Sequence, residues 1–147
     1  MITSHYPPAV GGTERQAHGL AAGLAREGRR VVVLTLARPD APARERRDGV
    51  EIERALTAAG RGPVFAATYG LSLLRHLRRL RPRAAVLHAH HLYLEAMAAA
   101  WAGLRSGLPA IAKVAGGGPD GDCARLRRTG LHRGLPLLRR LRCVVAT

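Results

Sequence analysis

The segment 5–15 constrains the fold of this chain more than any other part of the sequence. It contains two prolines and the adjacent glycines Gly11 and Gly12, and it is followed by apolar residues at helical spacing and by the apolar run 31–35. Glycine lets the backbone approach a ligand closely, and the first amide groups of a helix attract anions. The order of glycine loop, helix and strand therefore predicts a loop that binds phosphate.

The residues after the loop predict one helix over 14–27. Thr13 is a suitable N-cap, and Gln16, three residues later, completes a capping box. Apolar residues recur at helical spacing, at Ala17, Leu20, Ala21 and Leu24. Gly28 stands where a left-handed residue commonly ends a helix. Because the first amide groups of a helix have no partner within it, we expect an anion to be stabilised beside the glycine pair.

The rest of the chain alternates between strand and helix patterns. Strands are expected over 31–36, 50–54, 84–88, 110–114 and 143–146. Helices are expected over 14–27, 64–80, 92–105 and 134–142, and 37–48 is expected to be an exposed loop. This alternation is typical of an open parallel sheet covered by helices on both faces. With 147 residues, 47% of them hydrophobic, the chain is expected to form one domain.

Three landmarks occur in an order that is typical of a known family. The first is Tyr6-Pro7-Pro8-Ala9-Val10-Gly11-Gly12-Thr13-Glu14, continued by Leu20-Ala21-x-x-Leu24 and Gly28-x-x-Val31-x-Val33-Leu34-Thr35. The second is Val86-Leu87-His88-Ala89-His90-His91, and the third is Leu108-Pro109-Ala110-Ile111. Together they resemble the N-terminal domain of family 4 glycosyltransferases and cover nearly the whole chain. The resemblance implies an α/β fold with a Rossmann-like open parallel sheet and helices on both faces, the N-terminal half of a GT-B fold.

The resemblance also implies an activity and its substrates. Such enzymes transfer a sugar from a nucleotide-sugar donor to a hydroxyl acceptor, here with retention of configuration, in the synthesis of glycans, lipopolysaccharides or glycolipids. The expected partners are the nucleotide-sugar, which is a co-substrate, and a glycan or lipid-linked acceptor; no cofactor and no metal are expected. The implied donor diphosphate site is Gly11, Gly12, Thr13, Glu14 and Arg15. Alternatively, the two glycines only shape a tight turn.

The implied acceptor-binding residues are His88, His90, His91, Lys113, Gly116 and Gly117. His90 and His91 are the candidates for a catalytic group, since an imidazole can hold a proton near neutral pH. Packing and metal binding are the alternatives for these histidines, but strand alternation places His88 and His90 on one side and His91 on the other, which is poor for chelation. Lys113 can alternatively snorkel to solvent, and Asp120 and Asp122 are expected to stabilise a turn.

Both ends of the chain depart from the family pattern. Only residues 1–5 precede the Pro-Pro loop, so the first strand is expected to be clipped. Residues 143–147 resemble the last strand of the N-terminal domain, so the C-terminal donor-binding domain is expected to be absent. The Glu-x7-Glu signature of that domain is matched by Glu45 and Glu53, inside the first domain, which we interpret as coincidence. We therefore expect 1–147 to be the acceptor-side half of a truncated or split enzyme.

The chain is strongly basic. It carries 24 basic and 10 acidic side chains, a formal net charge of +14, and Lys113 is its only lysine. Arginines cluster with leucines at helical intervals, at positions 75, 78, 79, 81 and 83 and at 125, 127, 128, 133, 139, 140 and 142. Three interpretations stay open, namely solvated helix faces, docking on an acidic membrane surface, and nucleic-acid binding. An aromatic content of 3% leaves few rings on which bases stack, so no nucleic-acid partner is expected.

The sequence also limits the compartment and the class of function. It has no apolar run long enough to span a bilayer and no secretory pattern, so we expect a cytoplasmic location, either free or peripheral at the inner face of the membrane. Cys123 and Cys143 match neither a disulfide framework nor a zinc site. A dinucleotide dehydrogenase is disfavoured because Gly-x-Gly-x-x-Gly does not follow the first strand. The second class of function is a non-catalytic basic Rossmann-like module that binds an anionic glycan, a nucleotide or a membrane surface.

Overall fold

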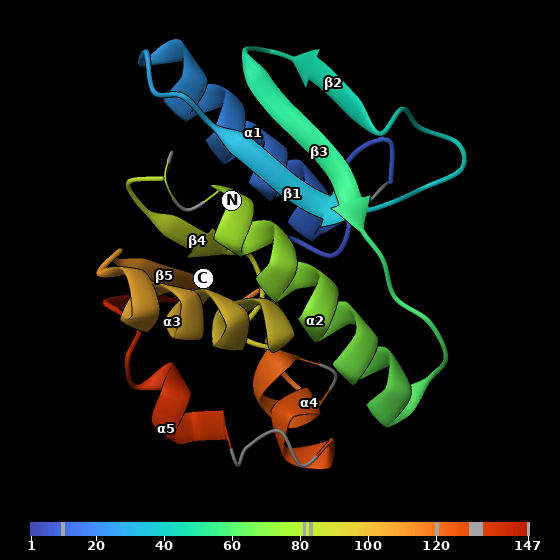
Figure 1. The fold of residues 1–147 in the computed structure, drawn as a ribbon, viewed down its shortest axis with the longest axis vertical. Helices are drawn as coiled ribbons and strands as arrows, with labels where there is room; N and C mark the ends of the chain where they lie inside the picture. The colour runs from blue at the N-terminus through green and yellow to red at the C-terminus, as the bar shows by residue number, and fades with distance from the viewer. Residues whose placement is uncertain (10, 81, 83, 120, 130–133, 147) are drawn as a thin grey trace. The chain divides into compact units, whose positions relative to one another are not determined.

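The computed structural model describes residues 1–9, 11–80, 82, 84–119, 121–129 and 134–146 (Figure 1). The chain divides into two compact units, Met1–Tyr69 and Gly70–Thr147. Helix α2, Gly62–Leu80, begins in the first unit and ends in the second. That residues 1–147 form a single domain stays a prediction.

The first unit combines one helix with a mixed sheet. Helix α1, Gly12–Arg26, leads to the strands β1, Val32–Leu36, β2, Arg44–Arg47, and β3, Val50–Leu56. Their order in the sheet is β1-β3-β2, with β1 parallel and β2 antiparallel to β3. Ile2 forms a parallel bridge to Leu34, and backbone hydrogen bonds join residues 1–4 to Val32, Leu34 and Leu36 of β1. The core of this unit contains Tyr6, Ala17, Ala21, Val31, Val33, Val50 and Ile52.

Helix α1 begins two residues earlier than the sequence predicts. Gly11 is the N-cap, with extended backbone at φ −172° and ψ 168°, and no side chain caps the helix. The predicted capping box of Thr13 and Gln16 is therefore wrong, because Thr13 already lies inside the helix. At the other end, Gly28 has φ 78°, which confirms the left-handed residue expected after the helix.

The predicted exposed loop 37–48 is partly wrong, since it contains strand β2. Asp48 and Gly49 have φ of 50° and 79°, and they join β2 to β3 through a tight hairpin turn in which Arg47 pairs with Val50. Asp-Gly is a strong signal for such a turn because both residues must adopt positive φ. The sheet of this unit is therefore not all parallel. Arginines on an exposed edge strand such as β2 also discourage pairing with other chains.

A buried arginine holds the proline loop against the sheet. Strand β3 alternates buried and half-buried residues, and Arg54 occupies a buried position with 1% of its surface exposed. Its guanidinium donates to the carbonyl oxygens of Pro42, at 3.1 Å, and Pro7, at 2.5 Å, and to a carboxylate oxygen of Glu45, at 3.1 Å. A buried charge is tolerated only when it is paired in this way. Arg54 therefore fixes the loop that leads into Gly11.

A second buried group fixes the same loop. The Tyr6 hydroxyl lies 2.9 Å from Nδ1 of His18 on α1, and Nε2 of that ring lies 2.9 Å from Asp48 in the hairpin turn. Burial raises the pKa of Tyr6 to about 12, so the phenol stays protonated at neutral pH. The loop, the helix and the hairpin are thus joined by one chain of polar contacts.

Replacing Arg54 by methionine is predicted to destabilise the protein. The substitution leaves the carbonyl groups of Pro7 and Pro42 without their donors and the Glu45 carboxylate without its buried partner, which should cost about 2–4 kcal/mol. The free energy of unfolding in urea measures this loss. Arg44→Met is the matched control, because the Arg44 side chain is 82% exposed and should cost less than about 0.5 kcal/mol. Equal losses in the two variants would contradict the role of Arg54.

The second unit is a parallel sheet with its connecting helices. It contains β4, Leu87–Ala89, α3, Leu94–Ser106, β5, Ala110–Lys113, α4, Asp122–Arg128, α5, Leu135–Leu138, and β6, Cys143–Val145. The strand order is β4-β5-β6, and both pairs are parallel. Helix α3 packs closely on the sheet through small residues. At Gly103 an added Cβ would lie 2.7 Å from the carbonyl oxygen of Leu108, so only glycine fits there without a shift.

The predicted elements of this unit are mostly confirmed. The strand predicted over 84–88 is shorter and later, at Leu87–Ala89, and the helix predicted over 134–142 ends at Leu138. Helix α4 is absent from the prediction, which expected only a turn around Asp122. Parallel strands joined by helices confirm the α/β, Rossmann-like fold class. None of the described helices is both long and apolar enough to cross a bilayer.

Candidate functional site

The predicted donor loop is open at the N-terminus of α1. Gly12 is exposed, and Gly11 and Thr13 are half-buried, so no side chain seals the bend. A Cβ added at Gly12 would meet nothing within 4 Å, and neither Gly11 nor Gly12 has positive φ. The glycines are therefore not required by the backbone conformation. Gly12 provides free space in front of helix amide groups that no side chain caps, whereas the space at Gly11 is filled by the Glu14 carboxylate.

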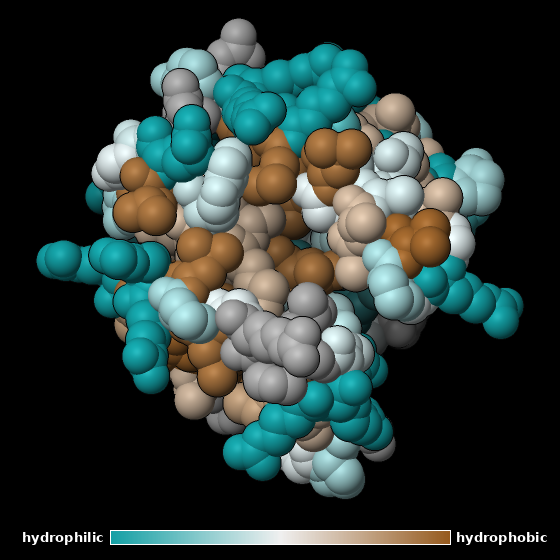
Figure 2. Space-filling view, turned by 60° about the horizontal axis from the view of Figure 1, so that its bottom comes forward, coloured by the Kyte–Doolittle hydropathy of each residue, from teal (hydrophilic) through white to brown (hydrophobic). Residues whose placement is uncertain are grey.

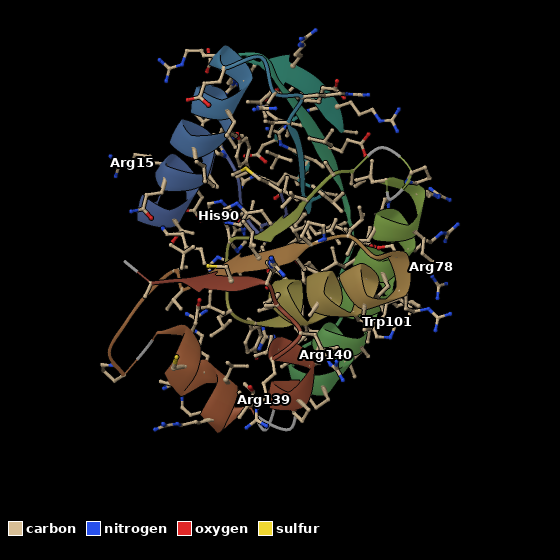
Figure 3. All side chains as sticks on the ribbon, turned by 90° about the vertical axis from the view of Figure 1, so that its left-hand side faces the viewer. Arg15, Arg78, His90, Trp101, Arg139 and Arg140 are labelled. Atoms are coloured by element: carbon tan, nitrogen blue, oxygen red, sulfur yellow. The ribbon has the colours of Figure 1, made fainter. Side chains whose placement is uncertain are left out.

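Glu14 and Arg15, the two charged residues of this loop, lie beside Gly11. The Glu14 carboxylate folds back against Gly11, where it would collide with an added Cβ. Arg15 is exposed and projects from α1 (Figure 3), with Nε 3.5 Å from the carbonyl oxygen of Gly11. A carboxylate near a helix N-terminus is stabilised by the helix dipole. A diphosphate that binds here must therefore displace Glu14, while the charge of Arg15 favours it.

The predicted acceptor histidines lie at the carboxyl end of β4. His88 is in the strand and is half-buried, whereas His90 follows it and is 1% exposed (Figure 3). Their ring centroids are 4.6 Å apart, which confirms that both point to the same side. His91 points elsewhere, since its Nδ1 lies 3.4 Å from Oδ1 of Asp122. The described residues contain no group of three or more histidine, cysteine or acidic side chains that would hold a metal ion.

His88 and His90 are neutral at physiological pH. Burial, helped by the nearby charge of Lys113, lowers the pKa of His88 to about 4 and that of His90 to about 3. Nε2 of His88 and both ring nitrogens of His90 are buried and have no hydrogen-bond partner among the described residues. A neutral imidazole can donate one hydrogen bond and accept another. The pair is therefore unsuited to donate a proton at neutral pH.

Lys113 is buried, although one of its two predicted interpretations requires it to be exposed. It ends β5 and is 7% exposed, so the interpretation that it snorkels to solvent is wrong. It lies one residue beyond Ala112, which pairs with Ala89, the residue between His88 and His90. Its charge contributes to the low pKa of both histidines. The structure therefore brings Lys113 together with the two histidines at adjacent strands of the second unit.

Asp122 stabilises the turn after β5, as the sequence predicts, and also ties it to the loop after β4, which the sequence did not reveal. Its Oδ2 accepts hydrogen bonds from the amide groups of Leu92 and Ala115, each at 2.9 Å. Burial by itself raises the pKa of Asp122, but the hydrogen bonds from His91, Ala115 and Leu92 outweigh burial and hold the pKa below its usual value. The only sequence signal was an acidic residue before an arginine-rich segment. Asp120, the other predicted turn residue, lies outside the described residues.

The glycine run after β5 forms a tight turn rather than a loose one. Gly116 and Gly117 are exposed, and the amide of Asp122 donates to the carbonyl oxygen of Gly116 at 3.2 Å. A Cβ on Gly121 would lie 2.7 Å from Gly117, so the chain passes over itself there. Gly116 and Gly117 thus stand at the same end of the sheet as His90 and Lys113, at the carboxyl ends of parallel strands, where ligands of such sheets bind.

Comparison with protein families adds an independent finding. Residues 11–147 match the family described as Glycosyl transferase 4-like domain. The chain therefore belongs to the Glycosyl transferase 4-like family, and a general glycosyltransferase function is supported. No curated protein matched the chain.

The histidine pair predicts a loss of stability in acid. The folded state keeps His90 neutral down to about pH 3, whereas the unfolded chain binds a proton near pH 6.5, so protons favour unfolding below pH 6.5. Between the two pKa values, each such group lowers the free energy of unfolding by about 1.4 kcal/mol for every pH unit of acidification. In His90→Leu the decrease in unfolding free energy between pH 6.5 and 4.5 should be smaller than in the wild type by about 2 kcal/mol. Urea titrations at the two pH values measure it, with the exposed His5→Leu as control; the same pH dependence in both variants would exclude a neutral buried His90.

Asp122→Ala is predicted to loosen both loops at the acceptor end. Two half-buried amide groups lose their acceptor, which should cost about 1–3 kcal/mol of unfolding free energy, and Asp122→Asn should cost less because its amide oxygen can still accept. Hydrogen exchange measured by NMR should show faster exchange at Leu92 and Ala115 in particular. Asp40→Ala is the control, since Asp40 only pairs with Arg38 at the surface. Unchanged exchange at both amides would refute the bridge.

Proposed function

We propose that this chain is the acceptor-side domain of a glycosyltransferase that moves a sugar from a nucleotide-sugar to a hydroxyl group of a glycan or lipid-linked acceptor. The observation that carries the proposal is the uncapped N-terminus of α1 at Gly11 and Gly12 in a member of the Glycosyl transferase 4-like family. Retention of configuration, a cytoplasmic location free or at the inner face of the membrane, and a separate donor-binding domain are parts of this proposal.

The chemistry assigned to the loop is stabilisation of the leaving group. When the sugar departs, negative charge grows on the nucleotide diphosphate, and groups that stabilise this charge lower the barrier. The free amide groups of α1 carry a partial positive charge of about half a unit. Gly12 leaves these groups accessible, and Arg15 adds a full charge beside them. Neither group needs a metal ion to act on the diphosphate.

The chemistry assigned to the acceptor end is recognition of hydroxyl groups. The unpartnered nitrogens of His88 and His90 would hydrogen-bond sugar hydroxyls, and Lys113, Gly116 and Gly117 would complete the site. His91 is held by Asp122 and suits a positioning role for the loop. The low pKa of His90 argues against proton donation by it at neutral pH, so its proposed role is binding.

A non-catalytic module that binds an anionic glycan, a nucleotide or a membrane surface is the second candidate. The formal net charge of +14 favours it, because such a field attracts anions with or without a reaction. Release of the nucleotide from a panel of nucleotide-sugars in the presence of acceptor distinguishes the two candidates. Turnover supports the enzyme, and binding of nucleotide-sugar without turnover, even when a complementary donor domain is supplied, supports the module.

Gly12→Val is predicted to weaken diphosphate binding without unfolding the protein. The new side chain extends into the space in front of the helix amides, and nothing lies within 4 Å of its Cβ. The dissociation constant of inorganic pyrophosphate, measured by calorimetry, should rise about tenfold or more. Gly19→Val is the matched control, because Gly19 is exposed on the same helix and has equally free space. Equal pyrophosphate affinity in the two variants would remove the loop from the proposed role.

A further inference from the structure

The positive charge of the chain is concentrated in the second unit. Gly70–Thr147 contains 14 arginine or lysine residues and three acidic ones, so it carries +11 of the formal charge of +14. Two of the three acids, Glu95 and Asp122, are 2% and 5% exposed, and the third lies outside the described residues. The described surface of this unit therefore offers its arginines almost no carboxylate. Figure 2 shows one face on which hydrophilic side chains project around apolar ones.

Two of these arginines stack on an aromatic side chain. The guanidinium carbons of Arg78 and Arg105 lie 5.5 and 5.3 Å from the ring centroid of Trp101 (Figure 3). Cations stack favourably on an indole ring in this way. The arginines after α5 are different, because Arg139, Arg140 and Arg142 are exposed and have no side-chain partner among the described residues.

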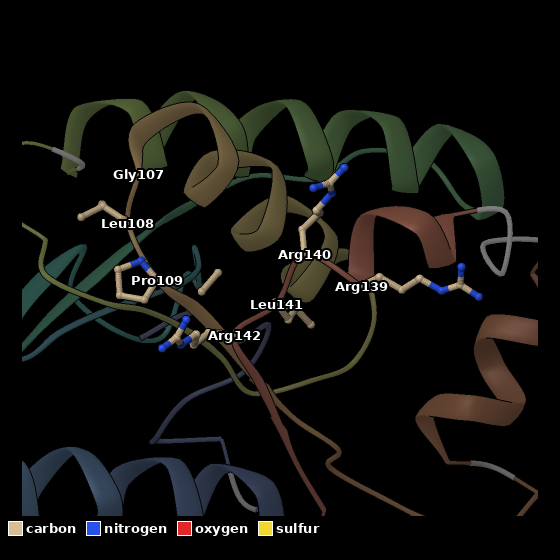
Figure 4. A pocket seen from close by; sticks show the side chains of 8 residues that line it. Gly107, Leu108, Pro109, Arg139, Arg140, Leu141 and Arg142 are labelled. Carbon is tan, nitrogen blue, oxygen red and sulfur yellow. The ribbon is translucent and has the colours of Figure 1, made fainter.

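These three arginines line a hollow of about 760 Å³ (Figure 4). Its other lining residues are Gly107, Leu108, Pro109, Ala110 and Leu141. The hollow lies before β5 and before β6, at the amino ends of the strands, whereas the predicted acceptor residues lie at the carboxyl ends. It is therefore separate from the candidate acceptor site. The hollow is open to solvent over much of its boundary.

The backbone around the hollow is held in place. The amide of Arg142 donates to the carbonyl oxygen of Ala110 at 2.7 Å, and the amide of Arg140 donates to Leu137 at 3.0 Å. Leu138, which lies between Leu137 and Arg140 in the chain, is buried. Figure 4 shows the side chains of Arg139, Arg140 and Arg142, which all line the hollow, pointing in different directions from the backbone. Arg140 and Arg142, which precede and follow the apolar Leu141 in the chain, therefore have hydrogen-bonded backbone amides.

We propose that this hollow binds a phosphate group, with Arg140 and Arg142 as its ligands and with Leu108, Pro109 and Leu141 in contact with the apolar part of the bound molecule. Guanidinium groups bind phosphate through paired, charge-assisted hydrogen bonds. Carboxylates, which would compete for the arginines, are absent from the residues that line the hollow. The apolar residues favour an organic phosphate over the inorganic ion. The inference goes beyond the proposed function, since it uses none of the residues assigned to donor or acceptor.

The test compares two double variants of the whole chain that lose the same charge. Arg140→Gln with Arg142→Gln removes the proposed ligands, and Arg75→Gln with Arg79→Gln removes two exposed arginines of α2. Binding of phenyl phosphate, which has an apolar part, is measured by calorimetry, and vesicle binding by flotation on phosphatidylcholine with or without phosphatidylglycerol. Thermal unfolding of each variant verifies that it is folded, and single Arg142→Gln repeats the measurement with a smaller change.

Loss of about tenfold or more in affinity in the first variant, with less than about twofold change in the second, supports the site. Binding of phenyl phosphate identifies a soluble organic phosphate as the source, and binding only to phosphatidylglycerol vesicles identifies a lipid headgroup. Equal effects of the two double variants, or no binding of either probe to the wild type, would overturn the inference. Pyrophosphate binding at Gly12 is independent of these outcomes, so failure here leaves the proposed function unaffected.

Discussion

Buried charges that are neutralised by main-chain groups hold the functional loops of both units. In the second unit the Asp122 carboxylate accepts the amide groups of Leu92 and Ala115, and so ties the loop after β4 to the loop after β5. In the first unit the Arg54 guanidinium does the converse, since it donates to the carbonyl groups of Pro7 and Pro42. Loops cannot pair their backbone groups as strands do, so a buried ion of the right sign replaces the missing partners. Arg54 therefore fixes the loop before Gly11, and Asp122 fixes the loops that follow His90 and Lys113.

The sites themselves are marked by groups that the fold leaves without partners. The helix amides beside Gly12 have no capping side chain, and the ring nitrogens of His90 are buried without hydrogen bonds to the described residues. Buried polar groups without partners are costly and uncommon in folded proteins. The ring nitrogens at the carboxyl end of β4 are such buried groups, whereas the uncapped amides of α1 begin at the exposed Gly12. Both features occur in a member of the Glycosyl transferase 4-like family.

The two units also differ in how their charged side chains are paired. In the first unit arginines face carboxylates, as in the pairs of Arg30 with Glu51 and Arg38 with Asp40. In the second unit the described acids are buried, and the arginines near Arg140 face solvent. A field of one sign favours anionic ligands over a range set by the ionic strength. The anionic ligands considered for this chain, from the donor diphosphate to an organic phosphate at Arg140, are consistent with that field.

Local patterns in the sequence determined the elements that depend on local spacing. Helical periodicity and Gly28 predicted α1, the apolar runs predicted β1, β3 and β5, and the landmarks around Gly11 and His88 indicated the family. Strand alternation also placed His88 and His90 on the same side, and the ring contact confirms it. The Asp48-Gly49 pair contained the signal for the β2 hairpin, but the surrounding charges made the segment resemble a loop.

Only the tertiary structure decided the partners of the charged side chains. Nothing near Arg54 in the sequence indicates that its guanidinium is buried on the carbonyl groups of Pro7 and Pro42, and nothing near Asp122 points to Leu92. Burial likewise decided that Lys113 does not reach solvent and that His90 stays neutral. The physical reason is that a pKa, a buried ion pair and a hollow depend on residues brought together from distant parts of the chain, whereas helix and strand preferences depend on neighbours in sequence.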